Sequence, residues 1–172
     1  MYNYTMNSTR PEWKKVYKEL GATFLYKRSP SFYLSVENAK RHIDIPKVST
    51  SNGLTQAICN FIKWKGYYSN RINTQGQVRV QKTTGYNPFA KDLGQQRQVK
   101  FTHSTTRKGT ADIDAIICGR PVKIEVKIGR DKLSDHQIKE KARVEGAGGI
   151  YYVAKTMEDF YEWYNREFAV SE

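Results

Sequence analysis

Two neighbouring segments decide the fold: ADIDAII at residues 111–117 and VKIEVKI at residues 122–128. In both, apolar and polar side chains alternate with the period of a β-strand that has one buried face. Gly119 and Arg120 lie between the segments, which predicts an antiparallel hairpin that turns at these two residues.

The register of this hairpin places several charged side chains on one face. If the hairpin closes symmetrically at the predicted turn, Asp114 lies opposite Glu125 and Asp112 lies opposite Lys127. All four then emerge on one face, while Ile113, Ile124, Val126 and Ile128 point to the other face. Asp112 and Glu125 become diagonal neighbours, roughly 7–8 Å apart at the backbone.

Two carboxylates in this arrangement can share one hard divalent cation. Mg²⁺ takes one or two protein carboxylates together with waters and substrate phosphate oxygens. Lys127 places a positive charge beside that position, where it could contact a phosphate or a polarised water. The alternative is that the charged face is simply solvated, as is common for antiparallel hairpins. Asp is disfavoured within strands, however, which favours the metal site.

Further elements surround the hairpin. Apolar residues at helical spacing predict a helix at 53–65 that is capped by Ser51 or Asn52. The S-x-x-Q pattern of residues 134–137 is a capping box that opens a helix ending near Gly146. The other expected elements are strands at 67–73 and 78–81, a long basic loop at 83–97, a strand at 150–154 in which Tyr151 and Tyr152 pack, and a final helix capped by Thr156 with Phe160, Tyr164 and Phe168 on one face. This order predicts an α/β domain with a mixed sheet.

The first 48 residues carry weaker signals. Pro11 to Leu20 predict a short helix that stops at Gly21, and residues 23–26 and 32–34 are typical of extended segments. The polar run at 49–53 indicates a boundary. We therefore expect an N-terminal extension or arm at 1–48 and the main domain at 49–172.

The charge of the chain is uneven. The 172 residues carry a formal net charge of +12, and residues 51–110 hold ten basic residues against one acid, Asp92. Such a segment favours binding of a polyanion, because the release of counterions supplies much of the affinity. The alternatives are that the basic charge serves solubility or docks on the acidic C-terminal half. The candidate nucleic-acid contacts in this segment are Arg71, Asn73, Arg79, Lys82, Lys100, Arg107 and Lys108.

Other classes of protein are disfavoured. No stretch approaches the roughly 20 apolar residues of a membrane span, and the polar N-terminus lacks the apolar run of a secretory signal. Cys59 and Cys118 are far apart and form no C-x-x-C pair, which argues against a disulfide scaffold or a structural zinc site. We expect a soluble cytoplasmic protein with no membrane partner.

Three motifs together carry a resemblance to a known family: KGTADI at 108–113, EVK at 125–127 and S-x-x-Q at 134–137. They resemble the PD-(D/E)xK nuclease superfamily, and most of all its virus-type replication-repair nuclease (VRR-NUC) branch. The resemblance spans about residues 50–160. It implies a restriction-endonuclease-like core of the order α-β-β-β-α-β, with a mixed central sheet flanked by helices. It also implies hydrolysis of DNA phosphodiester bonds with Mg²⁺ or Mn²⁺.

The resemblance also implies roles for individual residues. Asp112 and Glu125 would be the metal-ligating carboxylates, and the main-chain carbonyl of Val126 would be a further ligand. Lys127 would orient or activate the attacking water. Gln137 would support the site from the following helix, although a purely capping role is an equal alternative.

Accessory roles are implied for a second set of residues. Gln56 stands on the first helix where relatives often carry an accessory Glu or Gln, although Gln is also an ordinary surface residue. Asp114 is additional to the motif and is expected near the metal or paired with a basic residue. Arg71 and Asn73 resemble a family pattern and could contact phosphate, or could lie on a surface strand. Ala111 replaces the usual Pro of the motif.

The resulting expectation is a metal-dependent endonuclease that acts on DNA, selects for DNA structure and serves replication or repair in a bacterium or a phage-infected cell. One alternative is a nucleic-acid-binding module on the same fold without turnover. Another is a Holliday-junction resolvase, which would act as a homodimer.

Overall fold

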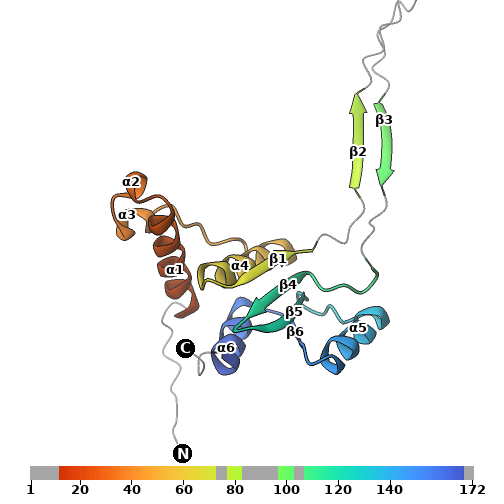
Figure 1. Ribbon diagram of the computed structural model, residues 1–172. Coiled ribbons are helices and arrows are strands. Elements are labelled where there is room, and N and C mark those ends of the chain that lie inside the picture. The colour runs from red at the N-terminus through yellow and green to blue at the C-terminus, as the bar shows by residue number, and fades with distance from the viewer. Residues whose placement is uncertain (1–11, 73–76, 83–96, 103–106, 169–172) are drawn as a thin grey trace, which may run out of the picture.

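A computed structural model describes residues 12–72, 77–82, 97–102 and 107–168, and the fold is a mixed α/β arrangement (Figure 1). The elements follow the chain in the order α1 (Glu12–Arg28), α2 (Pro30–Tyr33), α3 (Val36–Lys40), α4 (Ser51–Trp64), β1 (Tyr68–Arg71), β2 (Gln77–Lys82), β3 (Arg97–Thr102), β4 (Ile113–Ile117), β5 (Arg120–Val126), α5 (Asp135–Gly146), β6 (Ile150–Ala154) and α6 (Met157–Phe168). Within the described ranges, no helix has both the length and the apolar character needed to cross a membrane.

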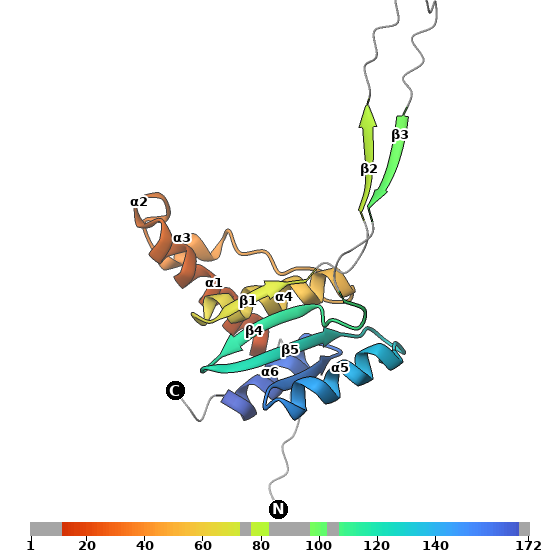
Figure 2. The ribbon, with the colours of Figure 1, turned by 45° about the vertical axis from the view of Figure 1, so that its right-hand side comes forward.

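Four strands form the main sheet in the order β1-β4-β5-β6. The β1/β4 and β4/β5 pairs are antiparallel and the β5/β6 pair is parallel, which confirms the predicted mixed sheet. The β2/β3 pair forms a separate two-stranded sheet that extends away from the main sheet (Figure 2). β3 is not predicted from the sequence, because its alternation is short and follows a loop-like basic stretch. That predicted loop at 83–97 lies, except for its last residue, outside the described residues.

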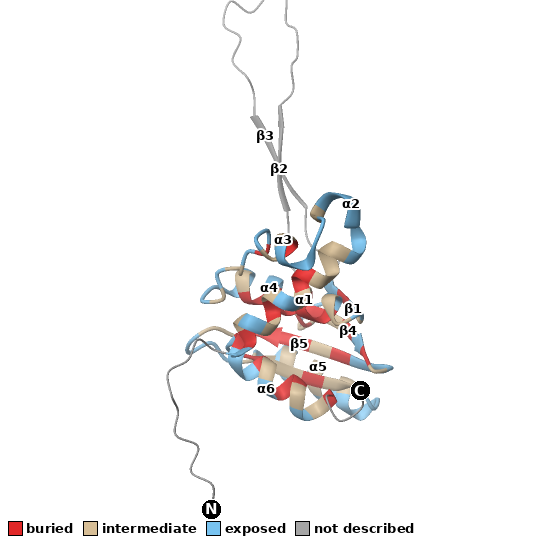
Figure 3. Cartoon of the chain, turned by 90° about the vertical axis from the view of Figure 1, so that its left-hand side faces the viewer, coloured by how far each residue is buried: buried red, intermediate tan, exposed pale blue. Residues whose placement is uncertain are grey.

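The core lies on one face of the main sheet. The alternating side chains of β4 and β5, including Ile113 and Ile124, are completely buried there. α4 and α6 pack on this face, where the Phe61 ring meets the rings of Phe160 and Tyr164 edge to face. Figure 3 shows this concentration of buried residues where the sheet and the helices meet. The predicted apolar face of α6 is therefore confirmed.

The N-terminal helix differs from the prediction. α1 continues through Gly21 to Arg28, and residues 32–33 belong to α2, so the predicted stop and both extended segments are wrong. Gly21 allows close packing instead: a Cβ there would lie 2.9 Å from the Trp64 ring. Trp13 and Tyr17 are buried in the common core, and Trp13 Nε1 donates a hydrogen bond to Glu158 Oε1 at 2.7 Å. Residues of the predicted extension thus pack against α4 and α6.

The turn of the β4–β5 hairpin lies one residue earlier than predicted, which shifts the pairing of the two strands by two residues. Ile113 pairs with Ile124 and Asp114 pairs with Lys123, and the turn consists of Cys118 and Gly119. Both turn residues have positive φ, 49° for Cys118 and 76° for Gly119, which a two-residue hairpin turn of type I′ requires. The predicted pairs of Asp114 with Glu125 and of Asp112 with Lys127 are therefore wrong. The predicted separation into a charged and an apolar face is correct, because a shift of two residues keeps every side chain on its face.

Candidate metal centre

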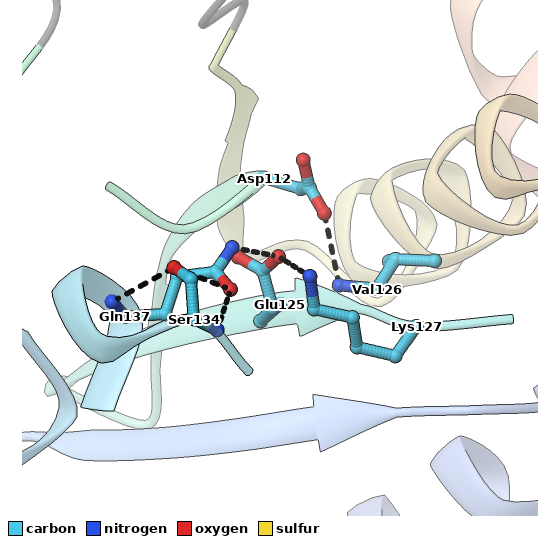
Figure 4. A network of polar contacts seen from close by, with 6 residues as sticks. All are labelled: Asp112, Glu125, Val126, Lys127, Ser134 and Gln137. Atoms are coloured by element: carbon cyan, nitrogen blue, oxygen red, sulfur yellow. Dashed lines mark hydrogen bonds and ion pairs between the residues drawn. The ribbon is translucent and has the colours of Figure 1, made fainter. Parts of the chain in front are cut away.

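Asp112 lies one residue before β4 and is held against the end of β5 (Figure 4). Its Oδ2 accepts a hydrogen bond from the Val126 amide at 2.9 Å, and its main-chain carbonyl accepts one from the Ile72 amide at 2.8 Å. Continued by one residue, the β4/β5 register places Asp112 opposite Glu125. Asp112 is thereby fixed to strands on both sides.

Glu125 is the most buried charged residue of the site, with only 3% of its surface exposed. Its Oε1 accepts a short hydrogen bond from Gln137 Nε2 and lies 3.1 Å from Lys127 Nζ. Its other oxygen, Oε2, is buried and has no hydrogen-bond partner among the residues that the structure describes. A buried carboxylate oxygen without a partner costs free energy unless another group neutralises it.

The surroundings of Glu125 oppose its ionisation. Burial raises the pKa of its carboxyl group to about 7, and the charge of Asp112 adds to this increase. Lys127 and Gln137 favour the charged form and offset part of the effect. A divalent cation bound between Asp112 and Glu125 would remove both causes of the increase, since it would pair with the charge and replace the lost hydration.

Gln137 performs two tasks at once. Ser134 Oγ accepts from the Gln137 amide, and Gln137 Oε1 accepts from the Ser134 amide at 2.9 Å, which confirms the predicted capping box. The amide nitrogen of the same side chain reaches Glu125. The start of α5 is therefore linked directly to the candidate site.

Gly109 brings the loop before Asp112 against the start of α5. Its φ is +87°, and a Cβ at this position would lie 2.5 Å from the carbonyl oxygen of His136. Only glycine tolerates both the conformation and this close approach. The KGTADI motif thus contains a packing residue as well as a carboxylate.

The structure does not bring the accessory residues into this network. Asp114 lies on the same sheet face and forms an ion pair with Lys123 at 2.8 Å, which is one of the two environments expected for it. Gln56 is exposed and donates to Asn60 on its own helix at 2.8 Å.

The candidate nucleic-acid contacts lie at the end of β1, on the β2/β3 pair and in the loop before Asp112. Arg71 ends β1 and donates to Asn52 Oδ1 at 2.5 Å, and Arg107 and Lys108 are exposed in the loop that leads to Asp112. In the backbone register of the β2/β3 pair, Arg79 is paired with Lys100 and Lys82 with Arg97. Asn73 lies outside the described residues.

The two carboxylates of this network are the kind of ligand that Mg²⁺ takes. Mg²⁺ is held by one or two carboxylates and keeps several waters. Asp112 and Glu125, with the main chain of Val126 beside them, could supply such ligands. The described part of the chain contains no group of three or more His, Cys, Asp or Glu side chains arranged to hold a metal.

Comparisons with known proteins add no family assignment: no family model matches the chain, and no curated protein matches it. The functional conclusion depends on the residues and the geometry described above.

Proposed function

We propose that this chain is a metal-dependent nuclease of the PD-(D/E)xK type, which hydrolyses phosphodiester bonds in DNA with Mg²⁺ or Mn²⁺. The observation that carries the proposal is the buried Glu125 carboxylate, which has one unpartnered oxygen and faces a second carboxylate, Asp112. Folding alone gains nothing from this pair, because like charges repel and burial removes their hydration. Such a pair is typical of a site that is completed by a cation.

Each residue of the network has a defined task in this proposal. Asp112 and Glu125 hold the cation, and the main-chain carbonyl of Val126 is the further ligand. When bound, the cation supplies positive charge that polarises the scissile phosphate and activates water. Lys127, whose Nζ is already 3.1 Å from Glu125, orients the attacking water and offsets charge that develops on the phosphate. Gln137 keeps Glu125 in its orientation through the hydrogen bond from α5.

The order of elements supports the family part of the proposal. α4, β1, β4, β5, α5 and β6 follow one another in the order α-β-β-β-α-β expected for a restriction-endonuclease-like core. The β2/β3 pair interrupts this order between β1 and β4 and forms its own sheet.

The positive charge supports DNA as the substrate. Arg107 and Lys108 are exposed four or five residues before Asp112, and further basic residues follow β1 in the chain. A phosphodiester backbone bound by these residues would lie close to the two carboxylates. We propose a cytoplasmic enzyme that selects for DNA structure in replication or repair.

A cleavage assay tests the proposal. The purified protein is incubated with single-stranded, duplex, flapped and four-way-junction DNA in Mg²⁺, Mn²⁺ or EDTA. We expect cleavage of at least one substrate with either metal and none in EDTA. Binding without cleavage of every substrate would instead indicate the non-catalytic module. Symmetric cleavage of the four-way junction by a dimer would indicate a resolvase.

A further inference from the structure

Tyr151 on β6 lies on the sheet face that carries the candidate metal centre. In the parallel β5/β6 pair, Lys123 is paired with Tyr151 and Glu125 with Val153. Paired residues share a sheet face, so the Tyr151 side chain lies on the face of Glu125 and diagonal to it. Tyr152 points to the opposite face, where its ring stacks on Trp163 with 4.1 Å between ring centroids.

The hydroxyl of Tyr151 is buried without a partner. Only 5% of the residue is exposed, and no described residue forms a hydrogen bond with its hydroxyl oxygen. Glu125 Oε2, on the same sheet face, is likewise buried without a partner in the described part of the chain. The hydroxyl is a hydrogen-bond donor, and each carboxylate oxygen has two acceptor positions, so Oε2 could accept from a water held by Tyr151 and still contact a cation.

The charges around Tyr151 keep it a donor. Burial raises the pKa of its hydroxyl above the ordinary value, and the carboxylates of Glu125, Asp112 and Glu140 increase it further. Glu140, on α5, already forms an ion pair with Arg143 Nη1 at 3.5 Å. Among the described residues, the acceptor on the sheet face of Tyr151 that lacks a partner is Glu125 Oε2.

We propose that Tyr151 is a positioning residue of the metal centre, whose hydroxyl donates through one water to the free oxygen of Glu125. This inference rests on the proposed function. The hydrogen bond would hold the Glu125 carboxylate in the orientation that a cation shared with Asp112 requires, through Oε2, whereas Gln137 and Lys127 contact Oε1. Groups that orient metal ligands in this way typically change metal affinity 10–100-fold when they are removed.

The test compares two phenylalanine variants of the full chain. Tyr151→Phe removes the buried hydroxyl. Tyr152→Phe is the matched control, since it removes a neighbouring hydroxyl that donates to the Asp159 carbonyl at 3.0 Å. Binding of Mn²⁺ alone is measured by calorimetry, and thermal unfolding is measured in EDTA.

We expect Tyr151→Phe to bind Mn²⁺ roughly tenfold more weakly while its unfolding midpoint in EDTA stays close to that of the wild type. Tyr152→Phe should show the reverse, with unchanged Mn²⁺ affinity and a lower midpoint, because it loses a hydrogen bond within the fold. Wild-type affinity for Mn²⁺ in Tyr151→Phe would overturn the inference and leave the proposed function intact. A fall in its midpoint equal to that of Tyr152→Phe, with unchanged affinity, would assign Tyr151 a purely structural role. If the wild-type protein binds no Mn²⁺, the proposed function and the inference both fail.

Discussion

At the scale of single residues, the buried carboxylate of Glu125 lowers the stability of the metal-free folded protein. Its carboxyl group has an ordinary pKa of 4.5, and in the folded protein burial and Asp112 raise this pKa to about 7. Between these two pH values the folded state keeps a proton that the unfolded state has released. The free energy of unfolding of the metal-free protein therefore falls as the pH rises from about 4.5 to about 7, and stays low above that.

Glu125→Gln should remove this penalty. The variant has no charge to bury, so we expect it to be more stable than the wild type at pH 8 in EDTA, by up to roughly 3 kcal/mol. At pH 4.5, where the wild-type carboxyl group is protonated, the two proteins should be nearly equal. Urea unfolding at both pH values measures the difference. A stability difference that is the same at both pH values would show that the Glu125 charge is not the cause.

At the scale of elements, Gly109 joins the loop before β4 to α5. Gly109→Ala should displace the start of α5, because the new Cβ meets the His136 carbonyl and the φ of +87° is unfavourable for alanine. Gly119→Ala is the matched control, since Gly119 has a φ of +76° but no atom within 4 Å of the position that a Cβ would take. Both variants should lose about 1 kcal/mol for the backbone conformation, and Gly109→Ala should lose more.

Thermal unfolding and DNA cleavage check this prediction together. We expect Gly109→Ala to reduce cleavage, because Gln137 moves away from Glu125, whereas Gly119→Ala should cleave like the wild type. Equal unfolding midpoints and equal cleavage rates for the two variants would contradict the role of Gly109.

The same elements show what a sequence can predict. The alternation at 111–117 and 122–128 correctly locates β4 and β5 and their charged face, because side-chain period is a local property. The position of the turn does not follow from the sequence, because Cys118 adopts a positive φ, which is uncommon outside glycine, asparagine and aspartate. The length of α1 does not follow either, because Gly21 is a helix stop by local rules and only contact with the distant Trp64 explains it.

The candidate site, too, can be predicted from the sequence only where local motifs mark its residues. Asp112, Glu125, Lys127 and Gln137 form one network, and each stands in a recognisable local motif. Gln56 is a candidate only by its place on a helix, and its side chain is bonded to Asn60 instead. The sequence predicts only packing for Tyr151, since nothing local distinguishes it from Tyr152 and the β5/β6 register is needed to assign the two to different faces.

At the scale of the whole molecule, the positive charge is concentrated between β1 and β4. The β2/β3 pair stands apart from the main sheet (Figure 2), and its register places Arg79 opposite Lys100. The chain on either side of the β2/β3 pair leads back to strands that border Asp112.

DNA affinity should therefore fall steeply with salt. We expect the logarithm of the binding constant to decrease linearly with the logarithm of salt concentration, by about 0.9 for every phosphate neutralised. Changing Arg79, Lys82 and Lys100 to Glu should weaken binding to all sequences alike and reduce this slope. The control changes Lys15, Lys18 and Lys27 of α1 to Glu, which alters the net charge equally. Titrations in EDTA that show no salt dependence, or equal losses in both triple variants, would refute the role of the β2/β3 pair.

We propose that Asp112 and Glu125 hold the cation that DNA cleavage requires. Single-turnover cleavage by Asp112→Asn in Mg²⁺ tests this role most directly. Asp114→Asn is the matched control, because Asp114 lies two residues away on the same sheet face and is paired with Lys123. We predict that Asp112→Asn folds normally, binds DNA in EDTA like the wild type and cleaves at least roughly 10²–10³-fold more slowly, while Asp114→Asn keeps most of its activity. Cleavage by Asp112→Asn at the wild-type rate would contradict the account.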